Sequence, residues 1–475
     1  MVVNDFLGGT ILTTIEKEIF ETTINYIDNK GTGRAEVWRD TGQTNPKKLK
    51  LNIPQTIPGE KVRVTVEQPN RRWARVFTDE ILEPSPDRIE PACPHFSLCG
   101  GCVFQHWNYE GQLQEKTDYV RKSFTSQGFD QKLVNDTIVT DSPWRYRNKM
   151  EFTFGRDGSL GLHEQGNFRN IIDLKTCLIA GETTEATMLE VSDWAKAHKL
   201  SGYHKDKHEG LLRHLMVRQS YATGEVMLGL FATEPPTGDL KDIADDLVEK
   251  ITSKFDQVKS LIWFVNNDWA DRTQAEEQYV LAGRDFIYDE MSGYRYRLWF
   301  DTFFQTNPRQ AERLVDLAVE MAKPTETESM IDLFCGVGTF SLPFASRVKE
   351  LVGVEIVEKS IESARRNAKD NGIDNTHFIT SDARRGFDQV IEKFGSPDLL
   401  MLDPPRSGAG GKVMRRIGRS KPNRMIYVSC NPESLAVDLK ELIPFGYKID
   451  QVQPVDLFPQ TMHVECVVLM SRVDE

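Results

Sequence analysis

Apolar and polar positions alternate with a short period in the first part of the chain. Between residues 14 and 84, short alternating stretches are separated by turn residues such as Gly31, Gly33 and Gly59. Several short strands joined by such turns indicate a small β-barrel of the oligonucleotide-binding (OB) kind. The expected strands cover residues 23–26, 36–38, 62–66 and 74–77. The proline-rich stretch that follows is typical of a linker.

The pattern becomes mixed between residues 90 and 295. A helix is expected over residues 109–126. In MEFTFGRDGSLGLH, Asp157 and Gly158 lie between two alternating runs, and Gly224 has the same place in LLRHLMVRQSYATGEVMLGLF. Such turn residues between alternating runs predict β-hairpins. This region is therefore predicted to be a mixed α+β domain.

Apolar strands and amphipathic helices alternate over residues 300–475. The expected strands cover residues 330–334, 351–355, 377–380, 399–402, 424–428, 449–455 and 464–470. Regular alternation of this kind predicts an α/β domain of the Rossmann-like, doubly wound type with a parallel sheet. The chain is thus predicted to be multidomain, as its 475 residues also suggest.

Composition limits the class of protein. Apolar residues make up 39% and charged residues 27% of the chain, which suits a globular protein. No apolar run approaches the roughly 18 residues that a bilayer span needs, and the first residues lack the features of a signal peptide. We therefore expect a cytoplasmic protein, not associated with a membrane, and a monomer.

The charge distribution bears on the partner. The formal net charge is −12, which argues against a nucleic-acid surface that covers the whole molecule. Residues 31–76 nevertheless hold ten lysines or arginines against four acids, a net of +6. This local excess is compatible with an RNA-binding barrel and equally with a solvated charged surface.

A glycine-rich turn follows the first strand of the C-terminal region. In MIDLFCGVGTF, Gly336 and Gly338 allow the backbone to approach a ligand closely. Glu355 ends the next strand, where a carboxylate can accept hydrogen bonds from ribose hydroxyls, and Asp382 follows the third strand. The third glycine of a dinucleotide fingerprint is missing, so S-adenosylmethionine fits better than NAD. The alternative is an ordinary tight turn.

The fourth strand ends in LLMLDPPRSG. Two prolines fix the loop after Asp403, so that its carboxylate is held at the end of the strand. Amino-group methyltransferases usually present an aromatic residue after the two prolines, but here the residue is Arg406. The loop therefore argues against N-methylation of a base, which stays the rival activity. In the alternative interpretation Asp403 only caps a turn.

A cysteine ends the fifth strand in MIYVSCNPES. Cys430 lies just before Asn-Pro, at the same edge as the expected cofactor, where a thiolate could add to C6 of a pyrimidine. Glu465, in PQTMHVECVVLM, has apolar neighbours that could raise its pKa and suit it to remove a proton from C5. The alternatives are a buried thiol and a carboxylate that faces water.

Taken together, these motifs resemble a known family. DLFCGVGTF, VGVE, DPPR, SCNP and HVEC, with FFQTN before them, occur in the order and at the separations of the RNA uracil-C5-methyltransferases. The resemblance covers nearly the whole chain and implies that the N-terminal barrel is a TRAM domain. It implies Cys430 as the nucleophile and Glu465 as the proton acceptor. The implied cofactor-binding residues are Gln305, Phe334, Glu355, Asp382 and Asp403. Thr339 departs from the asparagine that is frequent in the family.

Four further cysteines suggest a metal site. Cys93, Cys99 and Cys102 lie within ten residues of one another, and Cys177 follows in DLKTCLIA. Their spacing fits zinc held by four thiolates and fits an iron–sulfur cluster, and the alternative is a set of unrelated core cysteines. The family resemblance favours a 4Fe–4S cluster, and a structural role is expected because these cysteines lie in a different predicted domain from Cys430. Cys335 and Cys466 lie in apolar strands and are expected to pack in the core.

The resemblance also bears on the RNA substrate. An iron–sulfur site together with a TRAM domain implies 23S ribosomal RNA, with transfer RNA as the second possibility. The target base must be flipped out of the stacked RNA. A third reading, an RNA-binding protein with a vestigial site, is disfavoured by the presence of Cys430 and Glu465. Candidate RNA contacts are Arg145, Arg147 and Lys149, the neighbouring Trp144, Tyr146 and Phe152, and Lys412, Arg415, Arg416 and Arg419.

Overall fold

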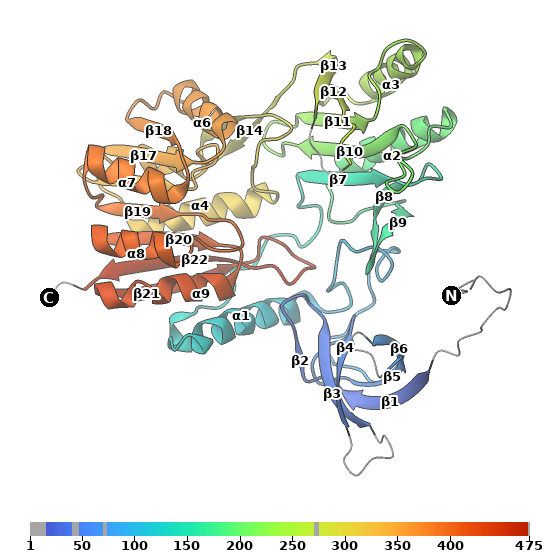
Figure 1. Ribbon diagram of the computed structural model, residues 1–475, viewed down its shortest axis with the longest axis horizontal. Coiled ribbons are helices and arrows are strands. Elements are labelled where there is room, and N and C mark those ends of the chain that lie inside the picture. The colour runs from blue at the N-terminus through green and yellow to red at the C-terminus, as the bar shows by residue number, and fades with distance from the viewer. Residues whose placement is uncertain (1–15, 40–46, 70–73, 270–274, 474–475) are drawn as a thin grey trace, which may run out of the picture. The chain divides into compact units, whose positions relative to one another are not determined.

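The protein forms two compact units in a computed structural model that describes residues 16–39, 47–69, 74–269 and 275–473. The first unit contains Met1–Ala92, Cys102–Gln112 and Gln460–Met462, and the second contains the rest of the chain. Residues 14 and 475, which bound the first and last predicted domains, lie outside the described residues. Figure 1 labels the helices and strands of both units.

The first unit is rich in β-structure, as predicted. It contains two three-stranded antiparallel sheets, ordered β1-β5-β6 and β2-β3-β4. The strands are β1 (Lys17–Thr23), β2 (Tyr26–Ile27), β3 (Gly33–Arg39), β4 (Lys47–Ile53), β5 (Lys61–Glu67) and β6 (Arg75–Glu83). In β5 every second residue is fully buried, namely Val62, Val64 and Val66, which is the alternation expected of a strand with one face on a core.

One predicted strand of this unit is wrong. The expected strand over residues 23–26 is a junction, because β1 ends at Thr23 and β2 begins at Tyr26. Between them the amide of Ile24 donates to the carbonyl of Glu60, and the amide of Asn25 donates to Arg34. The chain therefore changes its hydrogen-bonding partners here and passes from one sheet to the other.

The second unit contains Cys93–Gly101 and, from Leu113 on, the remainder of α1 (Tyr109–Ser126), whose bounds match the predicted helix. A seven-stranded sheet follows, ordered β13-β12-β11-β10-β7-β8-β9. Its strands are β7 (Lys149–Phe154), β8 (Leu160–Glu164), β9 (Asn167–Asp173), β10 (Leu212–Gln219), β11 (Val226–Ala232), β12 (Val258–Val265) and β13 (Glu277–Gly283). Both predicted hairpins are confirmed, since β7 pairs with β8 and β10 pairs with β11, each antiparallel.

Helices α2 (Glu182–Ala197) and α3 (Leu240–Lys254) accompany this sheet, and a short 3₁₀ helix, η1, covers Gln131–Leu133. The two-stranded sheet of β14 (Ile287–Met291) and β15 (Tyr294–Leu298) comes next in the chain. The sheet and these helices make up most of the region between residues 90 and 295, for which the sequence predicts a mixed α+β structure.

A second seven-stranded sheet forms the last part of the unit, in the order β18-β17-β16-β19-β20-β22-β21. Its strands are β16 (Ser329–Leu333), β17 (Glu350–Glu355), β18 (Thr376–Thr380), β19 (Leu399–Leu402), β20 (Arg424–Ser429), β21 (Tyr447–Val455) and β22 (Glu465–Arg472). The helices are α4 (Pro308–Ala322), α5 (Ser341–Ala345), α6 (Glu358–Asp370), α7 (Ala383–Phe394), α8 (Gly411–Ser420) and α9 (Pro432–Lys440), with the 3₁₀ helix η2 (Ile443–Phe445).

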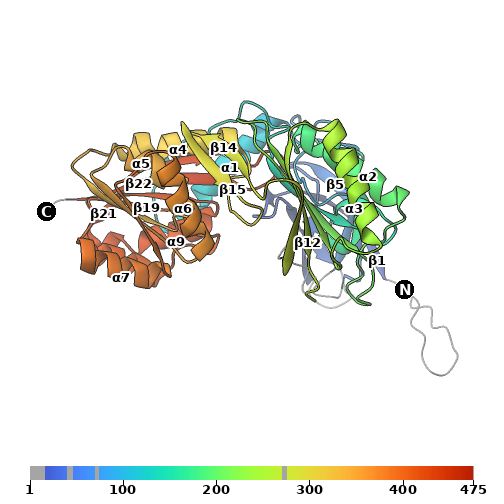
Figure 2. The same ribbon diagram turned by 90° about the horizontal axis from the view of Figure 1, so that it is seen from above.

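Helices cover both faces of this sheet. Helices α4 and α5 lie on one side, and α7 and α9 lie on the other (Figures 1 and 2). Successive strand residues therefore face different cores: Met401 packs in the cluster that includes α4, and Leu400 and Leu402 pack in the one that includes α8. Near-continuous apolar strands are the expected result of burial on both faces.

The sheet is mixed, so the prediction of a wholly parallel sheet is wrong in its last strand. The pairs β18-β17, β17-β16, β16-β19 and β19-β20 are parallel, but β22 runs antiparallel to both β20 and β21. Residues 456–464 connect β21 directly to β22 without a helix. A parallel connection would need a crossover of about a dozen residues or more, so this short link produces an antiparallel pair.

A buried ion pair fixes the connection between β21 and β22. The Nζ atom of Lys116, on α1, lies 2.6 Å from Asp456 Oδ1 and donates to the carbonyl of Phe458 at 3.0 Å. Both charged side chains are inaccessible to solvent. Asp456 Oδ1 also accepts from the amide of Phe458, so one carboxylate organises the start of the loop that leads to Glu465.

We expect Lys116→Met to lower the free energy of unfolding by about 3–5 kcal/mol, since it leaves Asp456 charged and buried without its cation. Urea denaturation followed by circular dichroism measures the change. Lys122→Met, at an exposed position of the same helix, is the matched control and should change stability by about 0.5 kcal/mol or less. Equal effects of the two substitutions would contradict this account of the ion pair.

None of the helices in the described ranges is long and apolar enough to cross a membrane.

Candidate active site

The predicted catalytic and cofactor residues gather at one edge of the C-terminal sheet. Strands β16, β17, β19 and β20 are parallel neighbours, so their carboxyl ends meet at the same edge. Phe334 follows β16, Glu355 ends β17, Asp403 follows β19 and Cys430 follows β20. Asp382 stands just after β18 at the same edge. Ligands of open α/β sheets bind at this edge.

The glycine-rich loop after β16 has the open backbone that a ligand cradle needs. Phe334 adopts a positive φ of 68°, which non-glycine residues seldom adopt, and Gly336 and Gly338 have φ values of 53° and 90°. A Cβ atom on Gly338 would lie 2.7 Å from the side chain of Leu342, whereas one on Gly336 would meet no atom within 4 Å. The space beside Gly336 is therefore open to a ligand.

Asp332 is a site residue that the sequence prediction missed. Its Oδ2 atom accepts a hydrogen bond of 2.5 Å from Ser341 Oγ, while its buried Oδ1 atom has no hydrogen-bond partner among the described residues. Burial raises the pKa of Asp332 to about 7, and the negative charges of Asp403 and Glu355 add to this effect. An acidic residue inside the apolar strand MIDLF was the available signal. A buried unpaired acceptor fits a site completed by a cationic or hydrogen-bonding ligand.

Two other acidic residues already accept hydrogen bonds from main-chain amides. Glu355 Oε1 accepts from the amides of Ile356 and Val357 at 2.8 and 3.0 Å, which fixes its carboxylate and directs the second oxygen elsewhere. Asp382 caps α7 by accepting from the amide of Arg385 at 3.2 Å. Gln305 is buried, and its main-chain carbonyl accepts from Asn148 Nδ2 at 3.1 Å.

Cys430 and Glu465 face each other across two paired strands. In the antiparallel register of β20 and β22, Ser429 lies opposite Cys466, so the next positions of the ladder are Cys430 and Glu465. Burial raises the pKa of the Cys430 thiol to about 11, and the negative charges of Glu465 and Asp403 add to it. Burial likewise raises the pKa of Glu465 to about 8, with a contribution from Asp403. The carboxylate of Glu465 thus disfavours ionisation of the neighbouring thiol.

Arg406 is the cation of this edge. Its positive charge opposes the increase in the pKa of both Cys430 and Glu465. The carbonyl of Arg406 accepts hydrogen bonds from Asn431 Nδ2 at 2.9 Å and Ser434 Oγ at 3.1 Å, which joins the DPPR loop to the segment after the cysteine. Arg406 therefore stands beside the thiol because the backbone of its loop is fixed there.

His463 is a second residue that the sequence prediction missed. Its Nδ1 atom lies 3.4 Å from Arg406 Nη2. Burial lowers the pKa of His463 to about 4, and the positive charges of Arg406 and Lys116 act in the same direction. The imidazole is therefore neutral at physiological pH and can accept a hydrogen bond from the guanidinium. The signal in the sequence was its place two residues before Glu465.

Two of the four cysteines predicted to bind a metal, Cys99 and Cys177, have thiol pKa values raised in part by neighbouring cysteines of the second unit. Burial raises the pKa of Cys177 to about 11, and Cys99 and Cys93 contribute to that increase. Burial and Cys93 also raise the pKa of Cys99, whose Sγ atom accepts a hydrogen bond of 3.4 Å from the amide of Gly101. Cys102 belongs to the first unit. Across the described residues, no group of three or more cysteine, histidine or acidic side chains is arranged to hold a metal ion.

The remaining two cysteines, Cys335 and Cys466, are buried and pack in the core, as expected. All seven cysteines lie in the described ranges, and no disulfide joins any of them.

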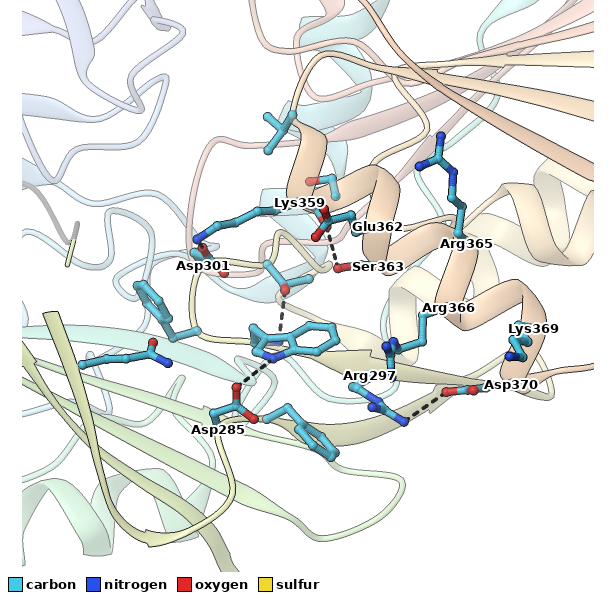
Figure 3. Close-up of a pocket in the computed structure, with 17 residues that line it drawn as sticks. Asp285, Arg297, Asp301, Lys359, Glu362, Ser363, Arg365, Arg366, Lys369 and Asp370 are labelled. Atoms are coloured by element: carbon cyan, nitrogen blue, oxygen red, sulfur yellow. Dashed lines mark hydrogen bonds and ion pairs between the residues drawn. The ribbon is translucent and has the colours of Figure 1, made fainter. Parts of the chain in front are cut away.

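A cleft elsewhere in the second unit is lined by none of the predicted site residues. It has a volume of about 930 Å³ and is bounded by α6 and by the residues that follow β15 (Figure 3). Its walls carry ion pairs between Lys359 and Asp301 at 3.1 Å and between Arg297 and Asp370 at 3.2 Å. Trp299 Nε1 donates to Asp285 in the same wall. The lining of this cleft thus mixes both signs, with five basic side chains and four acidic ones.

Comparison with known proteins gives a consistent result. Residues 269–473 match the model of the tRNA (uracil-5-)-methyltransferase family. A Bacillus cereus protein named an uncharacterized RNA methyltransferase is 36% identical over 466 residues, which cover 97% of this chain and 98% of that protein. A Caldanaerobacter subterraneus protein of the same description is 35% identical over 96% of this chain and 99% of that protein.

A solved structure resembles the chain over nearly its full length. It is the Pyrococcus abyssi tRNA (uracil-54, C5)-methyltransferase in complex with S-adenosyl-L-homocysteine. The two chains are 28% identical, with a TM-score of 0.74, and the match covers 95% of this chain and 99% of the other. The open glycine loop, the unpaired oxygen of Asp332 and the strand-end thiol agree with a methyltransferase site. The chain therefore belongs to the RNA uracil-C5-methyltransferase family and is an S-adenosylmethionine-dependent enzyme.

Proposed function

We propose that this enzyme methylates C5 of a uridine in 23S ribosomal RNA through a transient covalent bond between Cys430 and C6 of the base. The observation that carries the mechanism is the placement of Cys430 next to Glu465 in the β20–β22 ladder, where the Glu465 charge raises the thiol pKa and Arg406 lowers it. A nucleophile, a base with a pKa near neutrality and a cation are the groups that such a reaction requires.

The reaction follows from the electronic character of uracil, whose C5 is a poor nucleophile. The Cys430 thiolate forms a bond to C6, and the electrons of the C5–C6 double bond move toward C5 and the O4 carbonyl. S-adenosylmethionine, when bound, supplies the methyl group that C5 takes. The Glu465 carboxylate then accepts the C5 proton, the double bond re-forms and the sulfur leaves C6 with its electron pair. Cys430 is regenerated as a thiolate.

Arg406 would make the first step possible. Because burial raises the pKa of Cys430 to about 11, the free thiol is a weak nucleophile at neutral pH, and the nearby guanidinium favours the thiolate. The Arg406 carbonyl accepts hydrogen bonds from Asn431 and Ser434, which fixes the backbone of this residue next to the segment that follows the cysteine. The target base must reach this edge by leaving the RNA stack.

The cofactor would be held by residues of the adjacent strand ends. We assign Glu355 to the ribose hydroxyls, because its second carboxylate oxygen is free of the backbone hydrogen bonds that fix the first. Asp332 has an unpaired buried acceptor and joins this set. The remaining members are Gln305, Phe334, Asp382 and Asp403.

The substrate proposal rests on the combination of a TRAM domain and an iron–sulfur site that the family resemblance implies. The β-rich first unit, with ten basic residues against four acidic ones over residues 31–76, would be the TRAM domain and would contact RNA. The proposed domain boundaries are residues 14–84, 90–295 and 300–475. Transfer RNA is the second candidate, because the Pyrococcus abyssi relative is named for uracil-54 of tRNA.

Methylation of unmodified transcripts distinguishes the two substrates. We expect incorporation of labelled methyl groups as 5-methyluridine into a 23S ribosomal RNA transcript, and much less into tRNA transcripts. Digestion to nucleosides and mass spectrometry identify the product. Stronger methylation of the tRNA transcripts than of the 23S ribosomal RNA transcript would make tRNA the substrate. Incorporation as an N-methylated base would contradict the proposed chemistry.

We further propose that Cys93, Cys99, Cys102 and Cys177 bind a 4Fe–4S cluster, with zinc as the alternative. The support is chemical: Cys93 raises the pKa of the Cys99 thiol, and Cys99 and Cys93 both raise the pKa of Cys177, so an iron cation would favour the thiolates of these neighbouring cysteines. The amide of Gly101 already donates to a cysteine sulfur, as amides around cluster ligands do. Such a cluster would hold the chain together and would take no part in methyl transfer.

We expect anaerobically purified protein to be brown, with broad visible absorption and about four iron atoms per chain. Cys177→Ala should lose this absorption, and Cys466→Ala, which removes a core thiol, should retain it. Iron analysis and absorption spectroscopy make the measurement. A colourless protein with one zinc ion per chain would establish the alternative.

A further inference from the structure

Helices α7 and α8 carry a groove lined only by basic side chains. Its volume is about 170 Å³, and its five lining residues are Arg384, Lys412, Arg415, Arg416 and Arg419. No acidic residue lines it, although the whole chain has a net charge of −12. We call these five residues the cationic groove. The larger cleft beside α6 differs, because acids and bases pair across its walls (Figure 3).

The spacing of the residues on α8 explains how the groove forms. Lys412, Arg415 or Arg416, and Arg419 are three or four residues apart, so they share one face of the helix. Val413, Met414 and Ile417 occupy the opposite face and are buried in the core of the sheet. The apolar face thus fixes the helix and leaves the basic face to solvent, where Arg384 of α7 completes the groove.

The charges of the groove are incompletely balanced. Arg415 pairs with Glu441 at 2.6 Å, and Arg416 pairs with Asp388. Within the described residues, no hydrogen bond or ion pair engages the side chains of Arg384, Lys412 and Arg419, and all three are exposed. Like charges gathered along a helix face repel one another. A polyanion would relieve this repulsion and release its own counterions.

The groove begins next to the catalytic edge. Helix α7 starts directly after Asp382, and α8 starts after the loop that contains Asp403 and Arg406. Arg384 and Lys412 are in the first turns of their helices, so they lie at the carboxyl edge of the sheet, and Arg419 is in the last turn of α8. The two helices lie side by side on one face of the sheet (Figure 1).

We propose that the cationic groove binds the phosphate backbone of the RNA substrate next to the flipped uridine. From Lys412 to Arg419 the helix rises about 10 Å, at roughly 1.5 Å per residue. Phosphates of a stacked strand follow one another at about 3.4 Å along the axis, so about three of them fit this length. The inference rests on the proposed function, and it assigns the groove to affinity rather than to the chemical step.

The test compares two triple variants of the full-length enzyme. In the first, Arg384→Gln, Lys412→Gln and Arg419→Gln are combined. In the control, Lys241→Gln, Lys250→Gln and Lys254→Gln remove the same charge from α3, at two exposed positions and one half-buried position (Lys250), all of them paired with an acid. Filter binding of an unmodified 23S ribosomal RNA transcript is measured at several salt concentrations, without cofactor.

We expect the groove variant to lose about tenfold or more in affinity, and its log–log salt slope to become shallower by about 2–3, since each lost phosphate contact removes roughly 0.7–0.9. The control should keep the wild-type slope. At saturating RNA the kcat of the groove variant should stay within about twofold of wild type. A variant with Arg384→Lys and Arg419→Lys keeps the charge and should retain the wild-type slope.

Equal salt slopes for the groove variant, the control and the wild type would overturn the proposal and leave the groove a solvated surface. A fall in kcat with unchanged affinity would also overturn it, because the groove would then act on the catalytic edge. Failure of the wild-type enzyme to methylate any RNA would refute the proposed function separately, since the binding comparison does not depend on methyl transfer.

Discussion

Cys430→Ala is expected to abolish methyl transfer, with a loss in kcat/KM on the order of 10⁴-fold or more, as for removal of a nucleophile on which every later step depends. Without the sulfur, C5 of uracil does not gain the electron density that methyl capture requires. Binding of RNA and of cofactor should change little, because the substitution removes one partly exposed atom at the strand end. Single-turnover methylation and equilibrium binding separate the two effects.

RNA that contains 5-fluorouridine should trap the covalent state of the same enzyme. After methyl transfer the base cannot remove fluorine from C5 as it removes a proton, so the bond between Cys430 and C6 persists. Denaturing electrophoresis and mass spectrometry of the digested complex locate the adduct. Cys466→Ala is the matched control: Cys466 is fully buried in the core beside Glu465. Adduct formation in that variant and none in Cys430→Ala is the expected pair of results. Normal methylation without any adduct would defeat the covalent mechanism.

The arrangement of the catalytic edge could be predicted because each residue stands next to a strand whose pattern is unambiguous. Apolar runs such as residues 399–402 and 425–428 are buried, and they lie within β19 and β20. Parallel strands bring their carboxyl ends to one edge, so Asp403 and Cys430 had to lie near each other. The helix at 109–126 was equally clear.

Features that depend on distant partners could not be predicted. The antiparallel direction of β22 follows from the short connection at residues 456–464, which Lys116 fixes from a helix some 340 positions earlier. The break after Thr23 depends on hydrogen bonds to Glu60 and Arg34. The acidic residue within the strand MIDLF singled out Asp332 in the sequence, but its unpaired buried oxygen is a feature that hydrophobic periodicity does not reveal.

Glu465→Gln is the second substitution with a large expected effect, and it should stop the reaction after methyl transfer. An amide cannot accept the C5 proton, so the methylated base stays bound to Cys430 instead of leaving. We expect turnover to fall by about 10²–10⁴-fold, the range for loss of a general base. The first methyl group should still be transferred. Quenched single-turnover experiments on unmodified RNA should show protein-linked methylated RNA in this variant and very little in the wild type. Fast turnover without accumulation would mean that another group removes the proton.

The pH dependence of the wild type and of Glu465→Gln provides an independent test of the roles of Glu465 and Cys430. Burial raises the pKa of Glu465 to about 8, and only the ionised carboxylate accepts a proton, so release of product by the wild type should accelerate with rising pH up to about 8 and then level off. The rate of product release by Glu465→Gln should not show this rise with pH.

Because the Glu465 charge also raises the pKa of Cys430, formation of the covalent bond in the variant should begin at lower pH than in the wild type. The same raised carboxyl pKa means that Glu465 holds a proton in the folded state that it has lost in the unfolded chain, so its contribution to stability falls as pH rises from about 4.5 through 8. Thermal melting of Glu465→Gln should show a weaker decline over that window, and parallel melting curves would contradict the burial of this carboxyl group.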